Sequence, residues 1–417
     1  MRKAWLVLLG AVALGACAHP QTIEVAHTIV AAALPGPQLD GALASTTLPA
    51  IRDSVVTARL SIDSHADSRT PRPALNVALC LDTSGSMEGK AIEDARAAAL
   101  SFLAGIHPGD GFSLVTFDST VRVVVPPTHL EKTTDLEPIR AAIRSIRAQG
   151  TTDMADGLRA AIQNVQALYD GSRVNRVVLV SDGVPNDGSQ LRALAQQAQQ
   201  AGISLSAMGL GLDYDEILMG DLAQTGGGRF KYIDDSSKIA SYLSDELTRI
   251  SRVSARSATL EIEPGPGVVV ESIVGLPTSP TGRGGLLASL GDISLGSHRD
   301  VFFRMRAHGR RDGAAVELAD ATLRYVGSDG ATHEEHLFFG AHASASDDDV
   351  AKSKNDDVER GALAAQKAAD AIEAIRKAHD TDLVRRAPAN GAVMPAPVAP
   401  AVMKREHAAA MRTLLGD

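Results

Sequence analysis

The sequence predicts a doubly wound, mostly parallel α/β sheet with an adjoining all-β sandwich and a helical C-terminal extension. Between residues 76 and 250, apolar strand segments alternate with amphipathic helices, which is typical of a mostly parallel sheet covered on both faces. Between residues 251 and 345, short alternating strands are separated by Gly-Pro and Ser-Asp-Gly turns, which indicates a sandwich. The chain has 417 residues, enough for two or three domains at roughly 100–200 residues each.

The first 16 residues have the features of a signal peptide. Arg2 and Lys3 precede an apolar run of about ten residues, which is too short to span a bilayer. The run ends in Leu-Gly-Ala followed by Cys17, and this ending resembles the lipobox of bacterial lipoproteins. An ordinary secretory signal, cut near Ala16 or Ala18, is the alternative. The resemblance implies that Cys17 becomes a lipid-modified first residue in the cell envelope, and Ala18 then favours the outer membrane.

The segment between the signal peptide and the α/β pattern divides into two parts. Residues 17–50 contain four prolines among many Ala, Thr and Gly residues, and we expect them to form a tether. Within residues 51–75, the stretch 54–62 alternates loosely and predicts a strand that joins the sandwich, so that the α/β domain is inserted into it. Cys80, the other cysteine, lies in the apolar run 75–81 and is expected to pack in the core.

Strands and helices are expected in alternation within residues 76–250. The expected strands lie at 77–81, 112–117, 121–125, 177–180, 203–208 and 230–233. The expected helices lie at 90–106, 136–146, 154–165, 191–201, 217–223 and 238–250. The connection between the second and third strands is too short for a crossover, so the third strand is expected to be an antiparallel edge strand.

The remaining part of the chain is expected to supply most of the sandwich and then the extension. The expected strands of the sandwich lie at 258–262, 268–273, 292–295, 300–306, 315–318, 321–326 and 333–339. The extension covers residues 346–417. Within it, the spacing of apolar residues predicts an amphipathic helix at 358–379, and the composition of 387–400 indicates a Pro/Ala linker.

Polar side chains with oxygen donors follow the strands at three places in the α/β domain. Asp82, Ser84 and Ser86 come directly after the first strand, Thr152 precedes a helix, and Asp182 follows the strand at 177–180. Ligands bind at the carboxyl ends of the strands in doubly wound sheets, so these side chains should meet at one edge. Carboxylates and hydroxyls are hard donors, which suit Mg²⁺ or Ca²⁺. Helix capping and turns explain any one of these segments alone, but the three together predict a metal site.

Here the sequence resembles the von Willebrand factor A family. The resemblance rests on DTSGSM at 82–87, GTTDMADGL at 150–158 and VVLVSDG at 177–183, in the order and spacing of the metal-ion-dependent adhesion site. It covers about 175 residues (76–250), and no motif position departs from the family pattern. The segments GDGFSLVTFD at 109–118 and MGLGLDYDEILMGDLAQTGGGRFKYID at 208–234 look most like bacterial members related to calcium-activated chloride channel A-domains.

The resemblance implies a ligand set and a function. Ser84, Ser86 and Thr152 would ligate the metal through their hydroxyls, and Asp82 and Asp182 would ligate it directly or through water. Mg²⁺ suits this set best because it needs compact octahedral coordination, with Ca²⁺ or Mn²⁺ as alternatives. In the family, the metal captures an Asp or Glu side chain of a protein partner.

Composition and motifs exclude other classes of function. The net charge of −9 and an aromatic content of only 3% argue against a nucleic-acid partner. Ser84 and Ser86 lack a nucleophile elbow and an assignable histidine, so we do not expect an enzyme. The sequence therefore predicts a membrane-anchored, metal-dependent protein-binding module. The alternative is a structural envelope assembly protein in which the metal only stabilises the loops.

Overall fold

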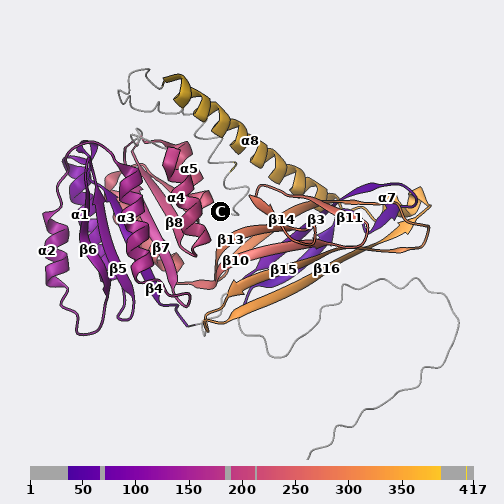
Figure 1. The fold of residues 1–417 in the computed structure, drawn as a ribbon, viewed down its shortest axis with the longest axis horizontal. Coiled ribbons are helices and arrows are strands. Elements are labelled where there is room, and N and C mark those ends of the chain that lie inside the picture. Colours follow the sequence, from indigo (N-terminus) through magenta and orange to yellow (C-terminus); the bar gives the residue numbers. More distant parts are fainter. Residues whose placement is uncertain (1–35, 66–70, 184–188, 212–213, 387–409, 411–417) are drawn as a thin grey trace, which may run out of the picture. The chain divides into compact units, whose positions relative to one another are not determined.

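The computed structural model of the chain describes residues 36–65, 71–183, 189–211, 214–386 and 410 (Figure 1). The predicted signal peptide 1–16, Cys17 and the linker 387–400 lie outside these described residues. Among the helices in the described part of the chain, none is both long and apolar enough to cross a membrane.

The α/β domain contains a six-stranded sheet in the order β6-β5-β4-β7-β8-β9. All neighbouring strands are parallel except β5 and β6, so β6 is the antiparallel edge strand that the sequence predicts. The strands are β4 Leu75–Asp82, β5 Gly111–Phe117, β6 Val121–His129, β7 Val174–Ser181, β8 Ser204–Leu210 and β9 Gly227–Ile233. The helices are α1 Lys90–Ala104, α2 Glu137–Ser145, α3 Met154–Ala167, α4 Ser189–Gln200, α5 Glu216–Thr225 and α6 Ile239–Ile250.

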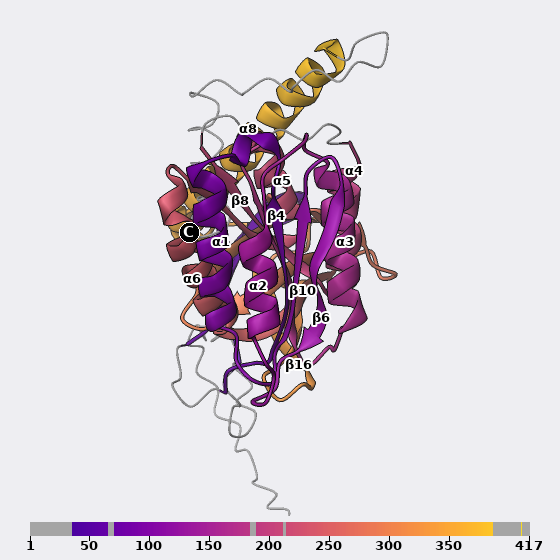
Figure 2. The ribbon, with the colours of Figure 1, turned by 90° about the vertical axis from the view of Figure 1, so that its left-hand side faces the viewer.

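The central strand β4 is apolar on both faces because each face packs against a different layer of helices. Val77 and Leu79 belong to a core cluster with residues of α1, α2 and α6. Ala78 and Cys80 belong to a second cluster with residues of α3, α4 and α5. Figure 2 shows α1 and α6 on one side of the sheet and α3 on the other. This arrangement explains the continuous apolar run, and it confirms the doubly wound fold class.

The sandwich consists of two further sheets, and strands from before the α/β domain take part in both. The first sheet has the order β1-β3-β14-β11, and the second has the order β12-β13-β10-β15-β16-β2. Their inner faces share one apolar core, in which Leu60, Leu260 and Phe303 are fully buried. Its strands are β1 Gln38–Leu43, β2 Thr47–Pro49, β3 Ser54–Asp63, β10 Val253–Pro264, β11 Val268–Ile273, β12 Thr278–Pro280, β13 Leu286–Ser294, β14 His298–Ala307, β15 Ala315–Val326 and β16 Thr332–Ser344.

The end of the segment expected to be a tether is part of the sandwich. β1 pairs with β3 along its whole length, and β2 pairs with β16, so the prediction for 17–50 is wrong over these strands. Gly41 shows why the sequence pattern did not predict β1 as a strand. A Cβ at this position would lie 2.6 Å from Leu337 Cδ2 and 2.8 Å from Phe339 Cε1, so these side chains need the space that glycine leaves. Partners on a distant strand therefore make this short, proline-flanked segment a strand.

The sandwich and the extension also differ from the expected boundaries. The two strands expected at 315–318 and 321–326 are one strand, β15, which passes through a register shift between Glu317 and Ala319. After α7 (Asp347–Lys352), the helix expected at 358–379 is longer and forms α8 (Asp356–Arg386). Ala362 and Ala365 of α8 pack on Phe302 of β14. This contact places α8 against the outer face of the sheet that contains β14.

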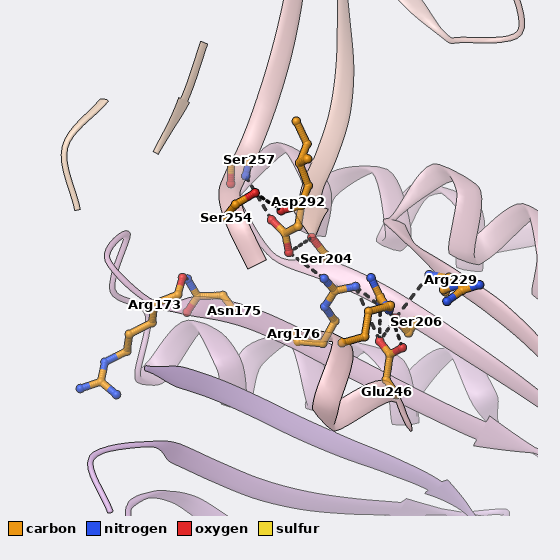
Figure 3. A network of polar contacts seen from close by, with 12 residues as sticks. Arg173, Asn175, Arg176, Ser204, Ser206, Arg229, Glu246, Ser254, Ser257 and Asp292 are labelled. Atoms are coloured by element: carbon orange, nitrogen blue, oxygen red, sulfur yellow. Dashed lines mark hydrogen bonds and ion pairs between the residues drawn. The ribbon is translucent and has the colours of Figure 1, made fainter. Parts of the chain in front are cut away.

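A buried charge network joins the two domains where β7 and β8 begin (Figure 3). The guanidinium of Arg176 in β7 is fully buried and donates to Asp292 Oδ2 of β13 at 2.6 Å. Its Nη1 lies 3.9 Å from Glu246 Oε1 of α6, and the Ser206 hydroxyl donates to the same oxygen at 2.6 Å. Burial alone would raise the pKa of the Glu246 carboxyl, but Arg249, Arg176 and Ser206 lower it to about 2. The network therefore keeps its charges at neutral pH.

Replacing Arg176 should destabilise the protein far more than replacing a comparable surface arginine. Arg176→Met leaves the buried carboxylate of Asp292 without its cation and removes one of the two arginines beside Glu246, and we expect a loss of about 3–5 kcal/mol in the free energy of unfolding. Arg324 is the matched control, because it also pairs with two carboxylates, those of Glu261 (2.7 Å) and Glu334 (2.6 Å), but is 45% exposed. Arg324→Met should cost less than about 1 kcal/mol. Urea unfolding followed by circular dichroism measures both losses, and equal losses would contradict the importance given to burial.

Candidate metal centre

Three loops at the carboxyl edge of the α/β sheet position the predicted ligands. The first loop follows β4 and contains the short 3₁₀ helix η1 (Gly85–Met87). The second precedes α3, and the third follows β7. Backbone hydrogen bonds join the first two loops, because the Gly85 N–H donates to the Gly150 carbonyl at 3.0 Å and the Gln149 N–H donates to the Thr83 carbonyl at 2.8 Å. The parallel direction of β4 and β7 then places the third loop beside them.

Hydrogen bonds connect the side chains of the first loop to the third. Asp82 Oδ1 accepts a hydrogen bond from the Ser84 N–H at 2.8 Å. The Ser84 and Ser86 hydroxyl oxygens lie 3.0 Å apart, and the Ser86 hydroxyl donates to Asp182 Oδ1 at 2.8 Å. A continuous series of hydrogen-bonded residues therefore runs from Asp82 to Asp182.

Thr152 completes the group from the second loop. The Thr152 hydroxyl and the Asp82 carboxylate both lie close to Gly183 of the third loop. A Cβ on Gly183 would lie 2.9 Å from Thr152 Oγ1 and 3.4 Å from Asp82 Oδ2. The other Asp82 contact is with Ser181, whose hydroxyl donates to Asp82 Oδ2. The structure thus brings Asp82, Ser84, Ser86, Thr152 and Asp182 together at one edge of the sheet. Their role as metal ligands stays a prediction.

The buried part of this group is electrostatically suited to a cation. Asp82 is fully buried and forms no ion pair with any residue that the structure describes. Burial raises the pKa of the Asp82 carboxyl, and hydrogen bonds from Ser181 and Ser84 oppose that shift. A divalent cation would stabilise the ionised form in place of the missing counter-charge.

The donor set fits a small hard cation only when the hydroxyls are counted. Within the described ranges, His, Cys, Asp and Glu side chains form no group of three or more that could hold a metal ion. The edge offers two carboxylates and three hydroxyls, all of them oxygen donors. Mg²⁺ and Ca²⁺ both accept such ligands. The residues present therefore fit a divalent cation held by a mixed carboxylate and hydroxyl shell.

Two residues that support the site were not identified from the sequence. Ser181 orients Asp82, as described above. Asp118, directly after β5, is fully buried, and its carbonyl accepts a hydrogen bond from the Asp153 N–H at 2.8 Å, which holds the loop of Thr152. Burial would raise the pKa of the Asp118 carboxyl, but the ion pair with Arg122 (2.6 Å) and hydrogen bonds from Thr120 lower it. The position of Asp118 at a strand end, like that of Asp82, is the signal that could have revealed it.

Comparison with known proteins agrees with the fold of the α/β domain. Residues 76–245 match the family model of the von Willebrand factor type A domain. YfbK of Escherichia coli K12 is 27% identical over 270 residues, which are 60% of this chain and 45% of YfbK. Inter-alpha-trypsin inhibitor heavy chain H4 of Bos taurus is 27% identical over 207 residues, 48% of this chain and 22% of that protein. The chain thus spans less than half the length of these curated relatives.

A solved structure extends the likeness beyond the α/β domain. A von Willebrand factor type A protein from Catenulispora acidiphila aligns with a TM-score of 0.66 at 15% identity, over 84% of this chain and 83% of that one. At this identity the likeness is one of fold. The resemblance to bacterial relatives of calcium-activated chloride channel A-domains stays a prediction. The family match and the shared fold together identify residues 76–245 as a von Willebrand factor type A domain.

Proposed function

We propose that this protein is lipid-anchored in the bacterial cell envelope and binds a protein partner through a divalent cation held by its von Willebrand factor type A domain. Domains of this family commonly mediate metal-dependent contacts between proteins. The observation that carries the proposal is the convergence of two carboxylates and three hydroxyls from three loops at the carboxyl edge of the sheet. Because Asp82 is buried while Ser86 is exposed, this group is closed on the protein side and open toward solvent.

Each residue of the group has a distinct part in this proposal. Asp82 and Asp182 would balance the charge of Mg²⁺ (or of Ca²⁺ or Mn²⁺), and Ser84, Ser86 and Thr152 would contribute neutral oxygens. The bound cation would supply an electrophilic centre for an Asp or Glu side chain of the partner. Ser181 and the backbone bonds of Gly85 and Gln149 join the loops through contacts within the protein.

These bonds argue against the alternative in which the metal only stabilises the loops. The loops are already joined by protein contacts, so a stiffening metal would add little. The contacts of Ser84 and Ser86 also argue against hydrolysis. In the described part of the chain their hydroxyls contact each other and Asp182, and neither contacts a histidine that would act as a base. We therefore propose a binding module and not an enzyme, with no nucleic-acid partner.

The membrane anchor in this proposal is lipid on Cys17. The proposal of a lipid anchor rests on the Leu-Gly-Ala-Cys17 motif that ends the predicted signal peptide. The proposed location is the outer membrane. Cys80 takes no part in it, because this thiol is free and fully buried, and burial raises its pKa. Stable anchoring by lipid follows from the number of buried CH₂ groups, at about 0.8 kcal/mol each.

Removing one ligand hydroxyl should weaken metal binding. We expect Thr152→Val, which keeps the side-chain shape, to raise the Kd for Mg²⁺ at least tenfold, measured by isothermal titration of MgCl₂ into the full chain. Thr151→Val is the matched control, because its side chain is exposed whereas that of Thr152 is 8% exposed. The control should bind like the wild type. Equal affinity in all three proteins would show that Thr152 is not a ligand.

Partner capture should require both the metal and Thr152. Crosslinking in intact envelopes, followed by affinity purification, should recover a partner that is lost with EDTA and with Thr152→Val but retained with Thr151→Val. Recovery that is insensitive to EDTA would instead favour the structural alternative.

Lipid labelling tests the anchor separately. We expect Cys17→Ser to abolish incorporation of radioactive palmitate and to release the protein from the membrane fraction. Cys80→Ala should remain labelled, because that thiol lies in the core. Labelling that persists in Cys17→Ser would contradict the anchor and leave the metal site unaffected.

A further inference from the structure

A large crevice lies at the junction of the two domains, away from the metal loops. Its volume is about 1540 Å³, and residues of α4, α5 and β9 form one wall while residues of β12, β13 and β14 form the other. Ser204 opens β8 and Gly227 opens β9, and both line the crevice. The crevice therefore lies at the amino edge of the parallel sheet, whereas the predicted metal ligands follow the carboxyl ends of its strands.

The lining of the crevice is rich in arginine although the whole chain carries a net charge of −9. The described residues that line it include four arginines but a single carboxylate, that of Asp292. Asp292 is already neutralised by Arg176 at 2.6 Å. Arg192 and Arg249 have carboxylate partners of their own, Asp221 at 2.9 Å and Glu246 at 2.6 Å.

Arg299 is different, because no carboxylate accompanies it. Its position opposite Ile62 in the pairing of β14 with β3 places it on the inner face of the sheet, at the mouth of the sandwich. Nη1 donates to the Leu290 carbonyl at 3.0 Å, and Arg299 forms no ion pair within the described ranges. Burial lowers the pKa of Arg299 to about 10, and no neighbouring acid opposes this shift.

A partly buried guanidinium without a carboxylate partner lowers the stability of the folded protein unless an anion binds it. A partly desolvated charge without a counter-charge destabilises the folded protein. A guanidinium also has five donors in a planar fork, of which the Leu290 carbonyl uses one. The remaining donors match the paired oxygens of a carboxylate or a phosphate.

We propose that the crevice is a second binding site, in which Arg299 binds the carboxylate or phosphate group of a polar ligand. Gln196, Gln224 and Thr225 also line the crevice and bring amide and hydroxyl groups for the uncharged part of that ligand. The site shares no residue with the metal group and needs no metal.

Titration of the full chain with two anions tests this site. Phosphate and citrate are each added in the presence of EDTA, with sodium chloride of equal ionic strength as the reference, and Tm and heats of binding are recorded. We expect saturable stabilisation by at least one anion. Phosphate alone would identify a phosphate ligand, and citrate alone would identify a polycarboxylate. No saturable effect of either anion on the wild type would overturn the proposal.

Variants assign the binding to Arg299. Arg299→Gln keeps a donor for the Leu290 carbonyl but removes the charge, and we expect it to weaken anion binding at least tenfold. Without anion its Tm should equal or exceed that of the wild type, because an unpaired charge is gone. Arg304→Met, on the opposite face of the same strand, should bind like the wild type. Unchanged affinity in Arg299→Gln, or an equal loss in both variants, would overturn the assignment. If Arg299→Gln does not fold, the wild-type titration still decides whether the chain binds either anion, and the absence of binding would overturn the proposal.

Discussion

The pairing of β3 with β14 is the constraint on which the rest of the structure depends. The two strands match over ten residues, from Ser54 opposite Ala307 to Asp63 opposite His298, although the whole α/β domain lies between them in sequence. The chain leaves the sandwich after β3 and returns to it at β10, so the α/β domain begins and ends beside the sandwich. β4 starts, and α6 ends, at the amino edge of the parallel sheet, so the sandwich is attached there. The three loops lie at the opposite, carboxyl edge, where Ser86 is exposed.

Buried charges at the two edges of the sheet differ in whether they have a partner of opposite charge within the protein. At the amino edge, Arg176 is buried between Asp292 and Glu246, so the charges of this network are balanced within the protein. At the carboxyl edge, Asp82 is buried and forms no ion pair with a positively charged side chain among the described residues. A buried charge that the protein leaves unbalanced favours a ligand of opposite charge, which supports the proposed metal site. By the same reasoning Arg299, unbalanced in the opposite sense, marks the crevice.

In the proposed interaction, the positive charge of a bound cation would attract an acidic partner that the net negative charge of the chain repels. The chain carries a net charge of −9, so an acidic partner is repelled at long range. A cation at the carboxyl edge would reverse the sign of the potential only within about a Debye length, roughly 8 Å at physiological ionic strength. Recognition would then depend on close fit around the metal loops and not on long-range attraction.

The sequence by itself determined the α/β order and the group of residues at the carboxyl edge. Both follow from local rules, since apolar periodicity distinguishes strands from helices, and polar residues directly after parallel strands must share an edge. Only the tertiary structure decided that β1 and β2 are strands, that Ser181 and Asp118 support the predicted site, and that Arg299 lacks a counter-charge. Each of these depends on partners far away in sequence. Pairing, burial and missing partners are properties of the folded chain, and no local pattern of residues contains them.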